Sequence, residues 1–305
     1  MITLGTGSYQ YEWIGDWAKL PAGKAFGYTH GVVTDANDNV YIYNQSPDAV
    51  CVFDREGKFI KSWGAEFKDG AHGMFLSREN GQEFLYFADI FRRIVVKTTM
   101  NGEVIFQLGM PDRPDIYADI KEFRPTDVCV APSGEFYVFD GYGKPWVHRY
   151  TADAKYIGSF GGDGSEPGKL NCPHGGWVDT RGQTQVLWVA DRGNSRIQKF
   201  TLDGKPIGFV TAGMKRPCCF FQHSSEMYVP DLDARVTILD ASDQVITILG
   251  DNPEAPETQG WPNIQSRLQP GKFNSPHACC VDSHGDLYVV EWISTGRVTK
   301  LRRLA

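Results

Sequence analysis

The sequence predicts an all-β fold, a six-bladed β-propeller of the NHL-like kind formed as a single domain by residues 1–305. A unit of strand, polar turn, strand, short loop and strand recurs six times. Its strands are rich in β-branched and aromatic residues, and its turns are rich in Asp, Asn, Gly and Ser. The unit repeats every 42 to 59 residues, close to the roughly 40–50 residues of a four-stranded propeller blade. No stretch shows the periodicity of a long helix.

The blades follow one another along the chain. The six copies are YTHGVVTDANDNVYIYNQSPDAVCVF, GAHGMFLSRENGQEFLYFADIFRRIVVK, RPTDVCVAPSGEFYVFDGYGKPWVHRY, NCPHGGWVDTRGQTQVLWVADRGNSRIQKF, RPCCFFQHSSEMYVPDLDARVTIL and SPHACCVDSHGDLYVVEWISTGRVTKL. A fourth strand such as GKFIKSWG follows each copy except the last. An unmatched strand, SYQYEWIG, stands at residues 8–15. We expect it to supply the missing outer strand and to close the ring.

The amino-acid composition argues against a nucleic acid or a membrane as the partner of this protein. The chain has 31 basic and 37 acidic residues, a net charge of −6, and no run of Lys or Arg that would suit a nucleic acid or an anionic membrane. No apolar run approaches the roughly 20 residues of a membrane span, and the N-terminus has no signal-peptide pattern. Seven scattered cysteines suit a reducing compartment. We therefore expect a cytoplasmic protein that acts on a small molecule; the oligomeric state is left open.

Histidine recurs at one position of the repeat, the slot where the first strand of each blade begins. The first strand lines the channel of a propeller, so the six slots are expected to converge. Neutral imidazole is a common ligand of Zn²⁺, and three histidines with one open position are typical of a catalytic site. A hydrogen-bonded core histidine is the alternative for any one slot, and the histidines outside the slots are expected in third strands or turns. The slots hold His30, His72, Thr126, His174, Cys218 and His277.

Acids and amides form a second row, at the ends of the second strands. These side chains can contact a substrate, but they more often cap the next loop through hydrogen bonds to the backbone, and we expect that role for most of them. They are Asn44, Asp89, Asp140, Asp191, Asp231 and Glu291.

A long loop, residues 250–276, precedes His277. Its length and its Pro, Gly and Trp content favour an ordered lid over the channel mouth, with Trp261 and Arg267 as substrate contacts. A surface insertion without a role in the site is the alternative.

The copy VADRGNSRIQKF (189–200) is typical of an NHL repeat. Residues 123–200 resemble peptidyl-α-hydroxyglycine α-amidating lyase, a six-bladed zinc enzyme that releases glyoxylate and leaves a peptide amide. The likeness extends more weakly over blades two and six. The resemblance implies zinc ligands, a catalytic tyrosine in VFDGYGK and an arginine in ADR. They fall on His72, His174, His277, Tyr142 and Arg192.

This chemistry is consistent with the residue types. A metal ion acts as a Lewis acid toward a substrate oxygen. A tyrosine serves as a general base only when its pKa falls from about 10, which a nearby cation favours. Tyr142 and Arg192 are therefore the predicted catalytic residues.

Some positions depart from the family pattern. Gln45 stands where the family has a second arginine, and Ala278 stands where it has an aspartate for structural calcium, which argues against calcium here. His30 fills a slot where the family has no ligand, and it is a further candidate ligand. The candidate substrate contacts are Gln45, Asp89, Arg92, Cys218, Trp261 and Arg267.

The predicted function is a metal-dependent lyase that cleaves a C–N or C–O bond of a small hydroxylated substrate. We expect one divalent transition metal, zinc first, while imidazole ligands leave Fe, Ni and Cu open. One alternative is a gluconolactonase-like metal hydrolase, a class that usually relies on carboxylate and amide ligands. Another is a non-catalytic NHL scaffold, for which a plain or basic face is expected.

Overall fold

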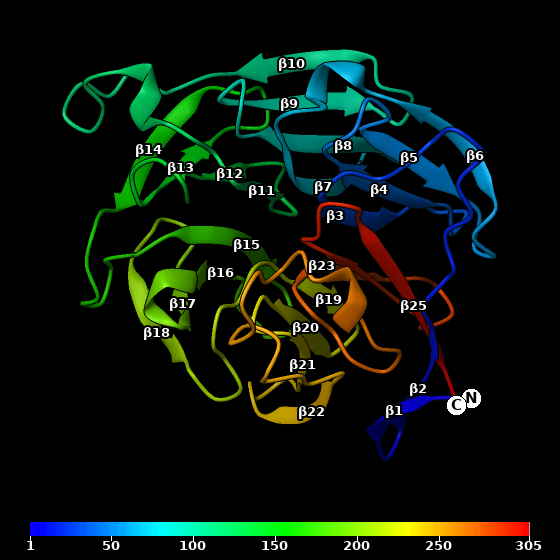
Figure 1. Cartoon of the computed structure of the whole chain (residues 1–305). Helices are drawn as coiled ribbons and strands as arrows, with labels where there is room; N and C mark the ends of the chain where they lie inside the picture. The colour runs from blue at the N-terminus through cyan, green and yellow to red at the C-terminus, as the bar shows by residue number, and fades with distance from the viewer. Residues whose placement is uncertain (305) are drawn as a thin grey trace. The chain divides into compact units, whose positions relative to one another are not determined.

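The computed structural model describes residues 1–304 of the chain, and within them the strands form six antiparallel sheets (Figure 1). Strands account for 47% of the residues and helices for 4%, so the fold is all-β. In five sheets, four strands that are consecutive in sequence lie next to one another in order. The predicted six-bladed β-propeller is confirmed.

The strands of each blade are as follows. Blade 1 contains β3 (Thr29–Thr34), β4 (Val40–Asn44), β5 (Val50–Phe53) and β6 (Phe59–Trp63). Blade 2 contains β7 (Ala71–Glu79), β8 (Gln82–Asp89), β9 (Ile94–Thr99) and β10 (Val104–Leu108). Blade 3 contains β11 (Asp127–Val130), β12 (Phe136–Phe139), β13 (Trp146–Tyr150) and β14 (Tyr156–Gly161). Blade 4 contains β15 (Pro173–Asp179), β16 (Val186–Asp191), β17 (Arg196–Phe200) and β18 (Pro206–Val210). Blade 5 contains β19 (Phe221–His223), β20 (Glu226–Asp231), β21 (Arg235–Leu239) and β22 (Val245–Leu249). Blade 6 contains β23 (Pro276–Val281), β24 (Leu287–Glu291) and β25 (Arg297–Arg303), with β1 (Thr3–Thr6) and β2 (Tyr9–Ile14).

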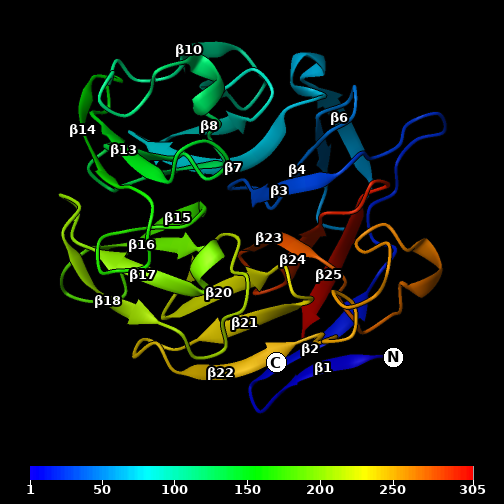
Figure 2. The same cartoon turned by 60° about the vertical axis from the view of Figure 1, so that its left-hand side comes forward.

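Blade 6 is completed by the N-terminal strand, as predicted. β2 pairs with β25 in antiparallel register, with Trp13 opposite Leu301, and Figure 2 shows β25 between β2 and β24. The structure adds β1 outside β2, a strand that was not predicted. The segment TLGT has little strand character by itself, and Gly5 in it has a positive φ of 86°. The pairing with β2 decides its conformation.

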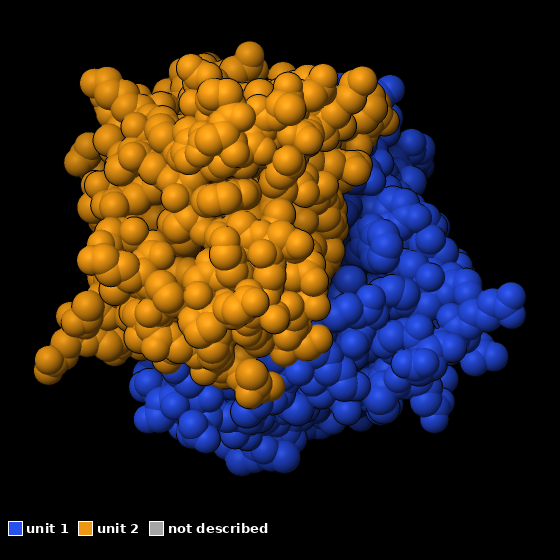
Figure 3. Space-filling view, turned by 90° about the vertical axis from the view of Figure 1, so that its left-hand side faces the viewer, with its two compact units in different colours: residues 1–68, 212–305 blue, residues 69–211 orange. Residues whose placement is uncertain are grey.

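The chain divides into two compact units (Figure 3). Unit 1 comprises residues 1–68 and 212–305, which hold blades 1, 5 and 6. Unit 2 comprises residues 69–211, which hold blades 2, 3 and 4. The single-domain organisation stays a prediction.

Apolar side chains fill the space between neighbouring blades of each unit. In unit 2, Tyr86 of blade 2 packs on Phe136 of blade 3, with ring centroids 5.6 Å apart, and Phe136 stacks on Tyr150 at 5.1 Å. In unit 1, Trp17 packs against Tyr288 at 5.0 Å. Each such large side chain contributes roughly 1.5–3 kcal/mol when it is fully buried. This packing brings β7, β11 and β15 together in unit 2, and β19, β23 and β3 together in unit 1.

Two details differ from the expected pattern. Cys218 lies ahead of β19 rather than within it, because the inner strand of blade 5 has only three residues. His223 was expected in a third strand or turn, but it ends β19, which is a first strand. Among residues 1–304, no helix is long and apolar enough to cross a membrane.

Candidate metal and catalytic site

Four slot histidines lie where the pairing of the first and second strands is irregular. The register shifts across the slot in β3, β7, β15 and β23. Such β-bulges re-aim side chains and are frequent next to active sites. β11 and β19 pair without a shift, and their blades have Thr126 and Cys218 in the slot. The bulged slots are those of His30, His72, His174 and His277.

Glycine makes two of these bulges possible. A Cβ on Gly73, directly after His72, would lie 2.3 Å from Asp127 Oδ1 of the next blade. A Cβ on Gly176 would lie 2.0 Å from Cζ of Phe139. Both glycines allow the bulged backbone to approach the neighbouring blade more closely than any side chain would permit.

In unit 2 the structure brings together four of the predicted residues. The Tyr142 hydroxyl lies 3.3 Å from Nε2 of His72 and 3.2 Å from Nε2 of His174. The Arg192 guanidinium donates to the same hydroxyl at 3.3 Å. The two imidazoles are buried, with ring centroids 4.8 Å apart, while Tyr142 is 37% exposed. Three polar groups thus converge on the phenol oxygen of a partly exposed side chain.

The tautomer of His72 follows from its backbone contact. Nδ1 of His72 lies 2.6 Å from the carbonyl oxygen of Thr126. A carbonyl only accepts, so Nδ1 carries the proton and Nε2 keeps its lone pair. That lone pair is directed at the Tyr142 hydroxyl. A bond of this kind from the second ring nitrogen is also what orients metal-binding histidines.

The loop that carries Tyr142 is anchored by Asp140, as the second-row prediction requires. Its carboxylate accepts from Gly143 N at 3.0 Å and from Lys144 N at 2.8 Å. Burial raises the pKa of Asp140 to about 6, although these hydrogen bonds oppose the change. A Cβ on Gly143 would lie 2.2 Å from the carbonyl oxygen of Glu122, so this turn needs glycine.

Arg192 begins the short helix η3 (Arg192–Asn194), directly after β16. Its backbone N donates to the carbonyl of Cys172 at 3.2 Å, and its guanidinium lies 3.4 Å from the Cys172 sulfur. Its Cζ is 5.3 Å from the centre of the Tyr142 ring. A cation at this position stabilises the negative charge that Tyr142 would carry as a base.

Arg124 also lies beside Tyr142 and was not predicted from the sequence. Its Cζ is 5.9 Å from the centre of the Tyr142 ring, and its carbonyl accepts from Tyr142 N at 3.3 Å. The signal in the sequence was its place in FRPTD, two residues before the Thr126 slot. That position lies outside both the first-strand slots and the second row of the repeat.

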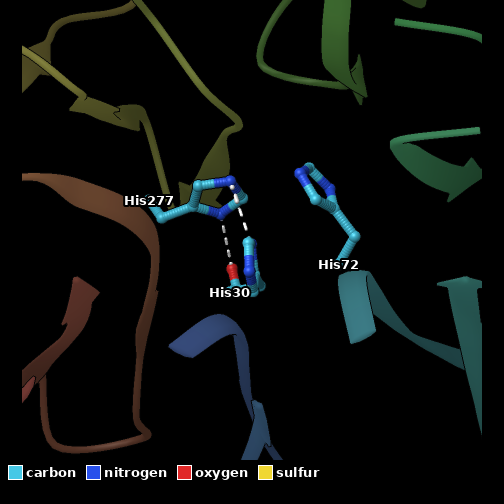
Figure 4. Close-up of side chains that lie close together, drawn as sticks. All are labelled: His30, His72 and His277. Atoms are coloured by element: carbon cyan, nitrogen blue, oxygen red, sulfur yellow. Dashed lines mark hydrogen bonds between the residues drawn. The ribbon is translucent and has the colours of Figure 1, made fainter. Parts of the chain in front are cut away.

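In unit 1 the structure pairs His30 with His277. Nδ1 of His277 donates to the backbone carbonyl of His30 at 2.8 Å, and Nδ1 of His30 lies 3.3 Å from Nε2 of His277 (Figure 4). Both rings are buried, and their centroids are 4.5 Å apart. Figure 4 also draws His72, which belongs to unit 2.

The donor set fits a transition metal. His72 and His277 each donate Nδ1–H to a backbone carbonyl, which leaves Nε2 as the basic nitrogen. Each lies next to a second imidazole, from His174 and His30 respectively. Neutral imidazoles oriented in this way suit Zn, Fe, Ni and Cu, so the histidine groups can hold such an ion.

The second-row side chains serve as caps. Asp89 accepts from the backbone N of Phe91 and Arg92, and Asp191 accepts from the backbone N of Asn171. Asn44, Asp231 and Glu291 accept in the same way from backbone groups that precede the first strands of their own blades. Asp89 is fully buried, and its contact with a substrate stays a prediction.

The other predicted substrate contacts have different surroundings. Arg92 follows the buried Asp89 in unit 2, and its guanidinium reaches Gln107 at 3.5 Å. Cys218 is fully buried in unit 1, where its sulfur lies 3.7 Å from the carbonyl of Arg216. Gln45, also in unit 1, donates its backbone N to the carbonyl of Tyr28.

The predicted lid is ordered by contacts within unit 1. Trp261 Nε1 donates to the carbonyl of Asn274 at 2.9 Å, and Arg216 covers its ring at 4.8 Å. Asn263 donates to the Tyr28 hydroxyl at 2.9 Å. Arg267 ends η4 (Gln265–Arg267) in the same loop and is exposed. The role of the loop as a lid stays a prediction.

Known proteins resemble the chain at low identity. No protein-family model matches it. Human NHL repeat-containing protein 3 is 29% identical over 197 residues, which is 61% of this chain and 55% of that protein. Peptidyl-alpha-hydroxyglycine alpha-amidating lyase 2 of Drosophila melanogaster is 24% identical over 264 residues, which is 83% of this chain and 59% of that protein. The chain thus matches only about half the length of its NHL repeat-containing relatives.

Solved structures share the fold. A streptogramin B lyase superposes with a TM-score of 0.62 over 96% of this chain and 97% of its own, at 13% identity. A putative gluconolactonase superposes with a TM-score of 0.63 over 96% of this chain and 100% of its own, at 16% identity. At such identities the likeness concerns the fold alone. The chain is a six-bladed β-propeller whose homologues include NHL repeat proteins and peptidyl-alpha-hydroxyglycine amidating lyases.

Proposed function

We propose that the protein is a metal-dependent lyase of small hydroxylated substrates, with Tyr142 as the general base. The observation that carries the proposal is the convergence of His72, His174 and Arg192 on the Tyr142 hydroxyl. The lyase named among the relatives supports the reaction class. An N-acyl-α-hydroxyglycine is the substrate that this relative's name suggests.

The residues of unit 2 supply the proton transfers. As a phenolate, Tyr142 takes the proton from the substrate hydroxyl. The electrons of that O–H bond form a C=O bond while the C–N bond breaks toward nitrogen. The proton passes from Tyr142 to the departing nitrogen, so the products are a carbonyl compound and an amide, with no change of oxidation state. Arg192 stabilises the phenolate before the transfer.

The metal would be held by slot histidines through Nε2, and when bound it acts as a Lewis acid toward a substrate oxygen. The equivalent slots of the repeat predict one zinc ion for His72, His174 and His277, with His30 as a further ligand. A hydrolase of the carboxylate-ligand type is less favoured, because Asp89, Asp140 and Asp191 each accept hydrogen bonds from backbone N–H groups.

The first test is the metal content of purified protein, measured by mass spectrometry. We expect about one transition-metal ion per chain, lost in His72→Ala, His174→Ala and His277→Ala. His284→Ala is the control, because its side chain is 58% exposed in a turn of unit 1. Loss in all three variants would support one shared ion. Full metal content in His174→Ala would contradict the proposed site.

The second test is turnover of N-benzoyl-α-hydroxyglycine, followed as glyoxylate release. Tyr142→Phe is expected to lower kcat by about 10²–10⁴-fold, because it removes the hydroxyl that serves as the base and keeps the aromatic ring. Its metal content and unfolding midpoint should stay at the wild-type values. A Phe variant that keeps more than half of the activity would exclude Tyr142 as the base.

A further inference from the structure

We propose that Arg124 binds the carboxylate of the substrate, so that the site selects hydroxylated acids over their uncharged analogues. This inference rests on the proposed function and names a residue that determines its specificity. Arg124 and Arg192 place two guanidinium groups at the Tyr142 ring, with Cζ atoms 5.9 Å and 5.3 Å from its centre. Arg192 donates to the Tyr142 hydroxyl, whereas the Arg124 side chain donates to the carbonyl of Ile90 and lies beside the ring, so the two cations have different roles.

The backbone of Arg124 is tied to the loop that carries Tyr142. Its N donates to Asp140 Oδ1 at 2.7 Å, and its carbonyl accepts from Tyr142 N at 3.3 Å. The backbone of Arg124 has little conformational freedom, because Pro125 follows directly and favours extended conformations for the residue before it. The backbone of Arg124 is therefore held in a constant position relative to the loop that carries the base.

The side chain of Arg124 is set up for an anion. Nε donates to the carbonyl of Ile90 at 3.3 Å, which orients the group and leaves the two terminal nitrogens for a forked contact. Arg124 is exposed, and within residues 1–304 no carboxylate lies in ion-pair distance of it. An exposed guanidinium beside the ring of the proposed base, without an acidic partner among residues 1–304, is suited to an acidic ligand.

The loops around Arg124 add to the positive charge. The segments 90–93, 121–124 and 141–144 contain five basic residues and one acid, Glu122, in a chain whose net charge is −6. Glu122 is paired with Lys144 at 3.3 Å. The local excess of positive charge favours the approach of an anion.

The chemistry of the substrate agrees with this placement. In an α-hydroxy acid, the hydroxyl and the carboxylate are on adjacent carbons. A hydroxyl at Tyr142 therefore brings the carboxylate within reach of a guanidinium beside the same ring. The family's second arginine is replaced by Gln45, and Arg124 supplies a second cation from another part of the chain.

The test compares two substrates and one inert ligand. N-benzoyl-α-hydroxyglycine carries the carboxylate, N-(hydroxymethyl)benzamide lacks it, and N-benzoylglycine has no hydroxyl to react. Arg124→Gln is expected to raise KM for the first substrate, and the calorimetric Kd of N-benzoylglycine, by about 10–100-fold, the loss typical of a charge-assisted hydrogen bond. In this variant, the KM for N-(hydroxymethyl)benzamide and the kcat for both substrates should stay within about 3-fold of the wild-type values.

Two further variants sharpen the result. Arg124→Lys keeps the charge but not the fork, so it should recover part of the affinity. Lys121→Gln removes the same charge three residues away and should change KM by less than about 3-fold.

The outcomes separate this inference from the proposed function. Equal losses on both substrates would overturn the inference and assign Arg124 a role in positioning the Tyr142 loop. If Arg124→Gln turns over N-benzoyl-α-hydroxyglycine as the wild type does, the role of Arg124 is overturned while the lyase function stands. Binding of N-benzoylglycine that depends on Arg124, without turnover of either substrate by the wild type, would support the carboxylate site and contradict the lyase.

Discussion

Asp127 connects the bulges that present two of the slot histidines. Its Oδ1 is the atom that a Cβ on Gly73 would strike, next to His72. Its Oδ2 accepts from Gly176 N at 3.3 Å, two residues after His174. The side chain is buried between the two bulges. One carboxyl group therefore contacts both of the bulged backbone segments that carry His72 and His174.

The ionisation of Asp127 makes stability depend on pH. Burial raises the pKa of Asp127 to about 8, against the opposing effect of hydrogen bonds from Val128 N and Gly176 N. The folded protein keeps the proton up to about pH 8, whereas an unfolded aspartate loses it near pH 4. Between these values the unfolded state binds fewer protons, so stability falls as pH rises, by on the order of 1.4 kcal/mol per pH unit.

Asp127→Asn should remove this pH dependence, because an amide does not ionise. The free energy of unfolding is measured in urea at pH 5 and at pH 7. From pH 5 to pH 7 it is expected to fall by roughly 2–3 kcal/mol more in the wild type than in the variant. Parallel pH profiles for the two proteins would contradict a raised pKa for this carboxyl.

A chain of hydrogen bonds connects the Tyr142 loop to strands β13 and β14. Tyr117 donates to Asp140 at 2.7 Å, and its oxygen lies 2.7 Å from Nε2 of His148. Because the phenol proton goes to Asp140, the phenol oxygen accepts from His148 Nε2–H. Nδ1 of His148 then accepts from the Ser159 hydroxyl at 2.6 Å. Burial lowers the pKa of His148 to about 3, which keeps the ring neutral.

Tyr117→Phe interrupts this chain between Asp140 and His148. It removes one hydrogen bond from Asp140 and leaves His148 Nε2–H buried without its partner. We expect a loss of about 1–3 kcal/mol in the free energy of unfolding, together with a lower kcat because the Tyr142 loop is less well held. Denaturant unfolding and turnover provide the measurements. Tyr150→Phe, a change at another buried tyrosine of blade 3, is the control. Equal stability of the two variants would mean that the network contributes little.

At the scale of the whole molecule, β2 joins the two ends of the chain. β2 and β25 pair between residues 11–14 and 300–303, and the Arg303 guanidinium donates to the Tyr11 hydroxyl at 2.7 Å. Trp13 in β2 is buried against Phe273, with ring centroids 5.0 Å apart. Residues 1–68 and 212–305 accordingly form one compact unit. Closure thus depends on contacts of very long sequence separation.

Trp13→Ala tests the contribution of this closure. Loss of a buried tryptophan should cost about 3–5 kcal/mol of unfolding free energy, through the apolar surface and the cavity left behind. Ile2→Ala, at a side chain that is 42% exposed, should change it by less than about 0.5 kcal/mol. Chemical denaturation gives both values. A loss below 1 kcal/mol for Trp13→Ala would show that β2 is not needed to stabilise blade 6.

The sequence by itself determined the six blades, the N-terminal strand of blade 6 and the equivalence of the four slot histidines. Each of these follows from a repeat, because residues at equivalent positions of a repeated unit adopt equivalent places in the fold. The capping of the next loop by Asp89 and Asp140 was predicted for the same reason, whereas Asp191 and Glu291 accept from backbone N–H groups that precede the first strands.

Only the tertiary structure decided which side chains meet. The bulges that carry the histidines depend on how closely Gly73 and Gly176 approach the neighbouring blade. The position of Arg124 beside Tyr142 depends on the hydrogen bonds that join two loops of blade 3. β1 becomes a strand only by pairing with β2. The physical reason is common to all three cases. Strand periodicity is a local property of the chain, whereas these contacts depend on packing and hydrogen bonding between segments separated in sequence.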